Sequence, residues 1–338
     1  MEDNKKVIFS VVMPVYNAER YLQDSLQSVL DQTRPADEII VVDNGSTDRS
    51  TGILRGYGDR IRFIRIEKNA GVSAARNLGI KESRGTHVAF IDADDRWFPD
   101  KLAVYEQKIM EHPSAALFFS DAFSISEEGD TRSLICCRPP DGRLFETLLV
   151  RNRVVTSSAV IRRSIVPEVG MFREDFLCRA GVEDWEFYIR ITHVFPALHI
   201  GQFLTEYRVY PTSAIQNNKR DLLEQDALRV IDLHTSSPDS SLPVRAAAIA
   251  SVYHASGVRH MAYVDLEGAR QRFVKCFADP ALFRSSLLMW LSTWGGPLFV
   301  KSLLKVRARI QQKKALAVVQ RGRENSISED RFFVADNR

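Results

Sequence analysis

Cysteine is scarce in this sequence. Its 338 residues hold four cysteines, at positions 136, 137, 178 and 276, and contain no C-x-x-C pair. The scarcity excludes a disulfide-stapled scaffold and a cysteine-based zinc finger. Two of the cysteines are adjacent in the chain, which places them poorly for bridging one another. We therefore expect four reduced thiols and a cytoplasmic protein.

A long hydrophobic run is also lacking. The longest uncharged stretch, between Arg284 and Lys301, has about 16 residues and is interrupted by two glycines and a proline, whereas a membrane-spanning helix needs about 20. The apolar run near the N-terminus is short and β-branched, and it reaches Pro14 with no small-residue cleavage site after it. It therefore does not match a signal peptide.

An excess of one charge sign is missing as well. The formal net charge is +3, which gives no global electrostatic reason to expect a nucleic-acid partner. The exception is local, because residues 301–323 hold eight Lys or Arg and no Asp or Glu. The last third of this run has no interleaved aromatic residues, so we expect no nucleic-acid binding from it either.

The first half of the sequence alternates short apolar runs, rich in β-branched residues, with segments of helical periodicity. We predict strands at 7–13, 38–42, 61–66, 87–91, 115–119 and 156–161, and helices at 18–32, 48–55, 71–83, 100–111 and 183–194. Repeated β-α-β units imply a mostly parallel sheet with helices on both faces, which is an α/β fold.

The character of the chain changes after Pro211. Strand patterns stop there, and four helices are predicted instead, near 218–234, 243–257, 264–277 and 280–316. We therefore divide the chain into an α/β domain over residues 1–212, a helical region over 213–320 and a disordered tail over 321–338.

Three carboxylates follow the strand predicted at 87–91. Asp92, Asp94 and Asp95 would repel one another unless a cation lay among them. Mg²⁺ or Mn²⁺ takes oxygen ligands and is commonly shared with substrate phosphates, so these acids are candidates for a divalent metal site. The alternative is a solvated acidic turn in which Asp95 caps the next helix.

Other polar residues lie at the same predicted edge of the sheet. Asp43 ends a neighbouring strand and is placed to accept hydrogen bonds from a base or a ribose, or to support the turn at Asn44. Glu183 and Asp184 begin a helix, as a general base would or as acids favoured by the helix dipole. Arg76 lies one turn inside a helix that opens with small residues, where it could pair with a local carboxylate.

Five segments, in order, resemble glycosyltransferase family 2. They are VVMPVYNAERYLQDSLQSVLDQT, EIIVVDNGSTD, NAGVSAARNLGI, VAFIDADDRWFPDKL and GVEDWEFYIRI, and they span roughly residues 7–210. The resemblance implies a GT-A fold, which is a Rossmann-like α/β/α sandwich, and inverting transfer of a sugar from a nucleoside diphosphate sugar with a divalent metal. It also implies roles for individual residues. For the nucleotide, the resemblance implies that Pro14, Tyr16 and Asn17 line the base pocket, that Asp43 contacts the base and that Arg76 contacts the nucleotide. For the sugar and the metal, it implies Asp92 near the ribose, Ala93 between the two acids, and Asp94 on the metal with Asp95 beside it. For the reaction, it implies Asp184 as the general base and Glu183 as the residue that positions the acceptor.

The sequence departs from the family at one place. Relatives often carry YR-x-H after the ED helix, whereas this chain has Tyr210 at the histidine position. Either Tyr210 supplies a hydrogen bond instead, or the loop closes differently. The processive Q-x-x-R-W motif is absent, which favours transfer of single hexosyl or N-acetylhexosaminyl groups. Polar and aromatic residues expected to shape the sugar and acceptor pockets are Asn152, Ser157, Ser158, Trp185 and Tyr210.

The resemblance favours UDP as the carrier, with GDP and dTDP as alternatives, and a saccharide or lipid-linked acceptor of the cell envelope. Residues 283–306 are rich in Leu, Trp and Phe and lead into the basic run, which suits a helix at an anionic membrane surface. The alternative is that Leu287, Leu291, Leu298 and Leu303 pack against the protein.

Two rival functions come from other classes. A nucleotidyltransferase would need a basic Gly-rich loop after the first strand, and the segment MPVYNAE lacks one. A degenerate nucleotide-binding scaffold is favoured by Tyr210 and opposed by the presence together of five acids, which are Asp43, Asp92, Asp94, Glu183 and Asp184.

Overall fold

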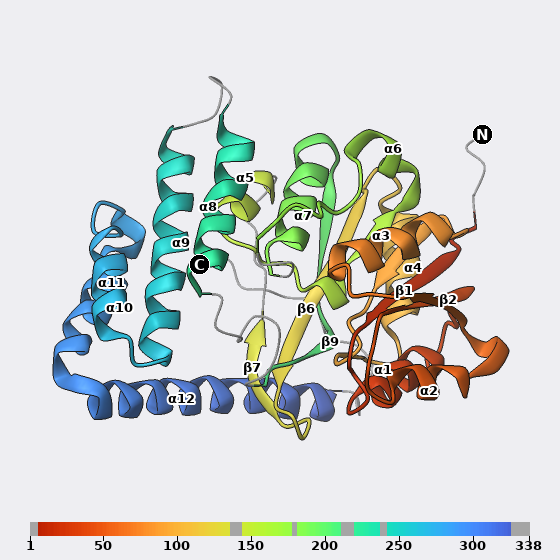
Figure 1. The fold of residues 1–338 in the computed structure, drawn as a ribbon, viewed down its shortest axis with the longest axis horizontal. Coiled ribbons are helices and arrows are strands. Elements are labelled where there is room, and N and C mark those ends of the chain that lie inside the picture. The colour runs from red at the N-terminus through yellow and green to blue at the C-terminus, as the bar shows by residue number, and fades with distance from the viewer. Residues whose placement is uncertain (1–5, 136–143, 178–180, 211–219, 237–241, 326–338) are drawn as a thin grey trace.

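A computed structural model describes residues 6–135, 144–177, 181–210, 220–236 and 242–325. An α/β sandwich forms one side of the molecule and a group of long helices forms the other (Figure 1). The sandwich contains the sheet, and the helical side begins at residue 220.

The sheet has nine strands in the order β3-β2-β1-β4-β8-β6-β9-β5, with β7 paired to β6. The strands are β1 (Phe9–Val15), β2 (Glu38–Asn44), β3 (Arg62–Ile66), β4 (His87–Phe90), β5 (Arg96–Trp97), β6 (Leu117–Ile125), β7 (Thr131–Ile135), β8 (Val160–Arg162) and β9 (Ala197–Arg208). Strands β1 to β4 are parallel, as are β6 and β9. The other four pairs are antiparallel, so the sheet is mixed.

Helices cover both faces of this sheet because its central strands are apolar on both sides. The helices are α1 (Leu22–Leu30), α2 (Ser50–Arg55), α3 (Val72–Glu82), α4 (Lys101–Glu111), α5 (Leu144–Val150), α6 (Val166–Val169) and α7 (Glu183–Val194). Val12 of β1 belongs to the core that contains Phe187 of α7, whereas Val11 belongs to the core that contains Leu26 of α1. Successive residues of one strand thus enter two cores.

Helix α3 approaches β1 closely. A Cβ atom added at Gly79 would lie 2.3 Å from Cγ1 of Val12, so only glycine fits where the two elements cross. This approach brings the start of α3 to the edge of the sheet at which β1, β2 and β4 end.

The helical region consists of α8 (Arg220–Thr235), α9 (Leu242–Ala262), α10 (Leu266–Val274), α11 (Pro280–Ser292) and α12 (Gly296–Asn325). Asp265 and Asp279 cap α10 and α11, each accepting a hydrogen bond from a backbone N–H in the first turn. The last helix runs beneath the sandwich alongside β7 (Figure 1), where Gln312 Nε2 donates to the carbonyl of Thr131 at 3.4 Å. In the described part of the chain, no helix combines the length and the apolar character that crossing a bilayer requires.

The predicted class, an α/β sandwich followed by a helical region, is confirmed, although the sheet is mixed rather than mostly parallel. The strand predicted at 156–161 is wrong in its first half, since Thr156–Ser158 is a 3₁₀ turn (η2) and only β8 is extended. Three strands that were not predicted, β5, β7 and β9, complete the sheet.

Some predictions fall at the limits of the described residues. Helix α12 continues to Asn325, so the tail predicted from residue 321 begins as helix, and residues 326–338 lie outside the described part. The domain boundaries stay predictions. Cys276 is a buried free thiol, whereas the cysteines at 136, 137 and 178 lie outside the described residues.

Candidate active site

The predicted acids gather at one edge of the sheet. Asp43 lies near the end of β2, Asp92 and Asp94 follow β4, and Asp184 lies in the first turn of α7. The carboxyl ends of parallel strands meet at the same edge, which is where ligands bind in open α/β sheets. The edge is therefore the candidate active site.

Arg76 joins two parts of this site. Its Nη1 donates to Glu183 Oε1 at 2.8 Å and its Nη2 donates to Asp92 Oδ1 at 2.7 Å. The side chain is buried, with the residue 3% exposed. Burial acts to lower the pKa of Arg76, but Asp92 and Glu183 outweigh it and the pKa is raised. The structure thus shows Arg76 paired with local carboxylates. Contact between Arg76 and the nucleotide stays a prediction.

Asp94 interacts with the residue that replaces the family histidine. The Tyr210 hydroxyl donates to Asp94 Oδ2 at 2.8 Å, and the Tyr210 ring lies 5.3 Å from that of Tyr21. Burial, together with the charge of Asp92, raises the pKa of Asp94 to about 6. Tyr210 thus supplies the hydrogen bond that the first alternative expected.

Asp95 is oriented differently from its neighbour. It is fully buried, one carboxylate oxygen accepts the Arg208 backbone N–H at 2.8 Å, and the other accepts the Ser157 hydroxyl. Burial raises its pKa well above the ordinary value, and the charges of Asp94 and Asp92 add to the effect. Both oxygens are engaged inside the protein, so this geometry does not support Asp95 as a metal ligand.

Asp184 is held by three donors. Its Oδ2 accepts the Thr156 hydroxyl at 2.7 Å, while its Oδ1 accepts the Trp185 backbone N–H at 2.6 Å and Asn152 Nδ2 at 3.5 Å. Burial, followed by the charge of Glu183, raises its pKa to about 6. A carboxylate whose pKa lies near the working pH suits a general base.

Glu183 is fixed more firmly than Asp184. One of its oxygens accepts the Arg76 guanidinium, and the other accepts the backbone N–H groups of Gly181 at 2.6 Å and Val182 at 3.1 Å. Gly181 has a φ of 114°, a conformation that favours glycine. Glu183 therefore fixes the start of α7, which places Asp184.

The predicted base pocket is built around a turn. Asp43 is fully buried and accepts hydrogen bonds from the Ser46 backbone, the Thr51 hydroxyl at 2.6 Å and Arg65 Nη1 at 3.1 Å. The Asn17 side chain supports the same turn by accepting the Thr47 N–H at 2.8 Å. The turn role proposed for Asp43 is thus visible. Two other predicted residues of this pocket differ in exposure, Pro14 being buried and Tyr16 exposed.

Two of the tentative pocket residues are in the interior. Ser158 is fully buried and its hydroxyl donates to the Val155 carbonyl at 2.7 Å. Trp185 packs in the core, and its indole N–H donates to the Leu148 carbonyl. Both side chains are thus buried and hydrogen-bonded inside the protein, and a direct pocket role for them stays a prediction. Asn152, in contrast, does contact Asp184.

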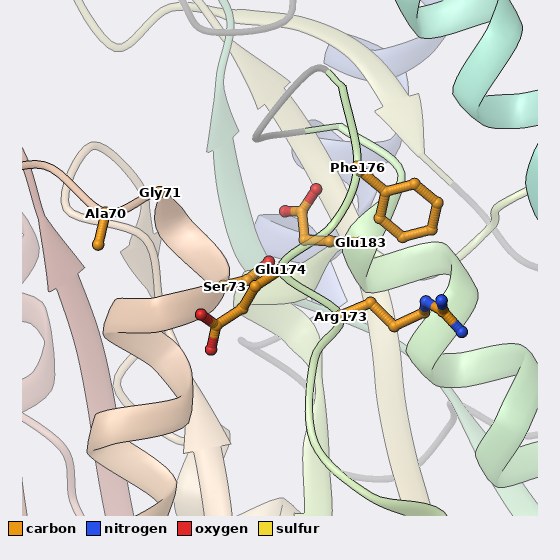
Figure 2. A pocket seen from close by; sticks show the side chains of 7 residues that line it. All are labelled: Ala70, Gly71, Ser73, Arg173, Glu174, Phe176 and Glu183. Atoms are coloured by element: carbon orange, nitrogen blue, oxygen red, sulfur yellow. The ribbon is translucent and has the colours of Figure 1, made fainter.

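A small hollow opens beside Glu183. It lies between the start of α3, with Ala70 and Gly71, and the segment that carries Arg173 and Phe176 (Figure 2). The hollow is therefore continuous with the site on the side of Arg76.

The acidic side chains of the candidate active site are of the kind that bind a divalent metal ion. Among the described residues, no three His, Cys, Asp or Glu side chains converge as a closed metal cage would require. Asp94, with Asp92 beside it, offers carboxylate oxygens whose mutual repulsion a cation would relieve. Mg²⁺ typically binds through one or two carboxylates and substrate phosphates, so these residues fit such an ion.

Arg208 was not predicted as a site residue, although it contacts two of the site acids. Its Nε donates to the Asp94 carbonyl at 2.8 Å, its backbone N–H holds Asp95, and its guanidinium lies 4.5 Å from the centre of the Tyr21 ring. The YR pair of the segment EYRVYPTS was the available sequence feature, since relatives carry it before the expected histidine.

Comparison with known proteins gave consistent results. The model of Glycosyl transferase family 2 matches residues 10–170. The "Putative teichuronic acid biosynthesis glycosyltransferase TuaG" of Bacillus subtilis (strain 168) is 31% identical over 219 residues, which are 64% of this chain and 84% of that protein. Glycosyltransferase GlyA of Streptococcus pneumoniae serotype 4 is 40% identical over 121 residues, which are 35% of this chain and only 17% of that protein.

Solved structures share the fold at low identity. The crystal structure of S. aureus TarS 1–349 in complex with UDP-GlcNAc is 17% identical, with a TM-score of 0.59, and the match covers 88% of this chain and 92% of that one. The mannosyltransferase PcManGT from Pyrobaculum calidifontis, in complex with GDP-Man and Mn²⁺, is 16% identical, with a TM-score of 0.57 and coverage of 91% and 87%.

Proposed function

The chain belongs to glycosyltransferase family 2, and from that premise we propose that it moves a hexosyl or N-acetylhexosaminyl group from a nucleoside diphosphate sugar to a saccharide or lipid-linked hydroxyl, with inversion. The observation that carries the proposal is the bridge made by Arg76. One buried guanidinium holds Asp92, on the donor side, and Glu183, next to the general base. The bridge holds two distant parts of the chain together, which supports a role in positioning the reacting groups for a single displacement.

The reaction is a single displacement at the anomeric carbon. The acceptor hydroxyl oxygen forms a bond to that carbon while its proton passes to Asp184, and the bond to the diphosphate oxygen breaks with its electron pair. Asp184, whose pKa is about 6, is mostly ionised at neutral pH and can accept the proton. Thr156 and Asn152 orient this carboxylate through their hydrogen bonds.

A divalent ion, Mn²⁺ or Mg²⁺, would be held by Asp94, with Asp92 beside it, and by the diphosphate of the donor. When bound, it supplies positive charge against the negative charge of the leaving diphosphate. Tyr210 and Arg208 fix the Asp94 side chain and backbone respectively. We propose UDP as the carrier. UDP-GlcNAc accompanies one structural neighbour and GDP-Man with Mn²⁺ another.

The proposal extends to peripheral attachment at the cytoplasmic face of an anionic membrane. It rests on an exposed apolar patch, here called the α11–α12 patch, whose residues are Leu288 (68% exposed), Leu291 (51%), Trp294 (62%), Leu298 (81%) and Phe299 (52%). Scattered exposed apolar residues are ordinary, but a contiguous group marks an interaction site. Exposed Lys301 and Lys305 follow the patch, as an interface with anionic lipid requires.

A thermal-shift panel tests the donor site. UDP, GDP, dTDP and their sugars would each be added with Mn²⁺, Mg²⁺ or EDTA, and a ligand far above its dissociation constant should stabilise the native state by about 3 kcal/mol. We expect metal-dependent stabilisation by UDP that Asp94→Ala removes and Asp31→Ala retains, since Asp31 lies at the exposed end of α1. No stabilisation by any nucleotide, with no donor hydrolysis, would instead support the degenerate scaffold.

A further inference from the structure

A three-residue turn contacts both the general base and the acids that follow β4. The turn is η2, Thr156–Ser158, and all three of its residues are buried. The Thr156 hydroxyl donates to Asp184 Oδ2 at 2.7 Å, and the hydroxyl of the next residue, Ser157, accepts the Asp92 backbone N–H at 2.9 Å. Adjacent residues of one turn therefore hold the base on one side and the acidic segment on the other.

The Ser157 hydroxyl joins the two ends of that acidic segment. It accepts the Asp92 N–H and donates to the Asp95 carboxylate, while the Asp95 N–H donates to the Asp92 carbonyl at 3.1 Å. Asp94 lies within the turn that is closed in this way, and its carboxylate accepts the Tyr210 hydroxyl at 2.8 Å. A hydroxyl has one donor and two acceptor positions, so Ser157 serves both partners at once. Its removal would leave the Asp92 N–H and a buried Asp95 oxygen without this partner.

Other groups hold the turn η2 in place. The Ser157 carbonyl accepts the Trp97 indole N–H at 2.7 Å, and the Ser158 carbonyl accepts Nζ of the fully buried Lys101 at 3.2 Å. The same Nζ donates to the Thr205 hydroxyl at 3.2 Å and lies 5.0 Å from the centre of the Trp97 ring. These contacts do not involve the Ser157 hydroxyl, so its loss should act on the acids and not on the turn itself.

We propose that Ser157 is a positioning residue of the transfer reaction, whose hydroxyl fixes Asp94 and its turn relative to the base that Thr156 holds. The inference rests on the proposed function, because it takes Asp184 as the base and Asp94 as the holder of the metal ion. Transfer requires the attacking oxygen and the leaving diphosphate to be aligned, and a misplacement of about 1 Å can cost about 10²-fold in rate. A turn that contacts both sides of the reaction sets their separation directly.

Substitution of the hydroxyl tests the proposal on the full chain. The Mn²⁺ concentration that gives half-maximal thermal stabilisation by UDP is called the Mn²⁺ requirement below, and its measurement involves no turnover. Ser157→Ala should raise the Mn²⁺ requirement about two- to tenfold, as the loss of one hydrogen bond predicts. The same variant should lower the transfer rate at saturating donor about 10- to 100-fold, because the reacting groups lose their alignment.

The matched control is Ser83→Ala. Ser83 is also buried, lies at the far end of α3 from the site, and donates its hydroxyl to the Ile80 carbonyl at 2.6 Å. Both alanine variants should lower the Tm, but Ser157→Ala alone should change the rate and the Mn²⁺ requirement. Ser157→Cys keeps a weak donor and should give intermediate values. Values indistinguishable from those of Ser83→Ala would overturn the proposal, whether in the alanine variant or, should that variant not fold, in the cysteine variant.

Thr156→Val separates the two sides of the turn. It removes a hydrogen bond that favours the ionised form of Asp184, so the apparent pKa of the pH–rate profile should rise above about 6 while the Mn²⁺ requirement stays unchanged. Ser157→Ala should leave that pKa unchanged. The burial of the base, the charges of Glu183 and Arg76 beside it and its hydrogen bond from the turn are all retained in that variant. Equal changes of both quantities in both variants would show a general loosening of the turn and would overturn the positioning role.

The proposed function and the positioning role fail in different ways. A wild type that gains no metal-dependent stabilisation from any nucleotide and transfers no sugar would overturn the proposed function, and the role of Ser157 with it. A wild type that shows both properties, with Ser157→Ala matching Ser83→Ala in rate and in Mn²⁺ requirement, would overturn the positioning role alone.

Discussion

The sandwich and the helical region treat charge in opposite ways. In the sandwich, four charged side chains are buried and hydrogen-bonded, since Asp43, Arg76, Asp95 and Glu183 each make at least two hydrogen bonds. In α11 and α12, apolar side chains are exposed, and the basic side chains beside them are exposed too. Burying a charge is costly unless it is paired, and exposing apolar surface is costly unless it meets a partner.

The difference shows how each region is suited to its work. A reaction that moves one proton and one diphosphate needs fixed carboxylates with shifted pKa values, which only a packed interior provides. Recognition of a large acceptor or a membrane needs surface that is accessible before binding. Substitutions of the buried charged residues in the sandwich should therefore change the transfer rate, the free energy of unfolding or both, whereas substitutions on the exposed faces of the helical region should change binding alone.

The largest effect is expected at Asp184. General-base assistance typically contributes about 10²–10⁴-fold, so Asp184→Asn should leave the fold intact and lower the transfer rate by about that factor. Asp59→Asn, at an exposed position, serves as the control. A variant that retained more than about a tenth of wild-type turnover would remove Asp184 from the role of base.

The next largest effect concerns the Arg76 bridge. Removing one partner of a buried ion pair leaves an uncompensated charge, which costs about 3–5 kcal/mol. Arg76→Met should therefore lower the free energy of unfolding by that amount in urea denaturation, because Asp92 and Glu183 lose their shared partner. The exposed Arg55→Met should change it by less than about 0.5 kcal/mol. Equal stability of the two variants would mean that buried charge does not distinguish the regions.

The order of the elements could be predicted because local sequence determines it. Strands β1, β2 and β4 are apolar on both faces, and each is followed by a helix with clear periodicity. Strand β9 was missed because its residues alternate irregularly between buried and exposed, so no two-residue period marks it. Three of the four antiparallel pairs involve β8 or β9, whose partners lie far away in sequence.

The identity of the site acids could be predicted, but their orientation could not. Asp94 and Asp95 are adjacent, and yet one meets Tyr210 at the edge of the sheet while the other meets Ser157 and the Arg208 backbone inside. The Arg208 contact spans 113 residues of sequence, so no local pattern encodes it. The burial of Trp185 in the core has the same origin in long-range packing.

The third prediction concerns stability against pH. Folding raises the pKa of Asp184 from its ordinary value of 3.8 to about 6, so the native state binds more protons than the unfolded state between these values. This contribution to stability is present below pH 3.8 and is lost as the pH rises through 6. Asp184→Asn removes the titrating group, so its stability does not fall in this way. The unfolding free energy of the variant minus that of the wild type should therefore be larger at pH 7.5 than at pH 4 by roughly 1–3 kcal/mol. A pH-independent difference would contradict the raised pKa.

The smallest effect on folding is expected in the α11–α12 patch. Leu291→Ser with Leu298→Ser should leave the unfolding free energy within about 0.5 kcal/mol, because both side chains are already mostly exposed to water. The same double variant should bind anionic vesicles at least tenfold more weakly in co-sedimentation, since even one fully buried leucine contributes about 2 kcal/mol and about 1.4 kcal/mol corresponds to tenfold. Met110→Ser removes an equally exposed apolar side chain from α4 and should change neither quantity. Destabilisation of the double variant, without loss of vesicle binding, would mean that these leucines serve packing. The helical region would then not differ from the sandwich in having apolar surface reserved for binding.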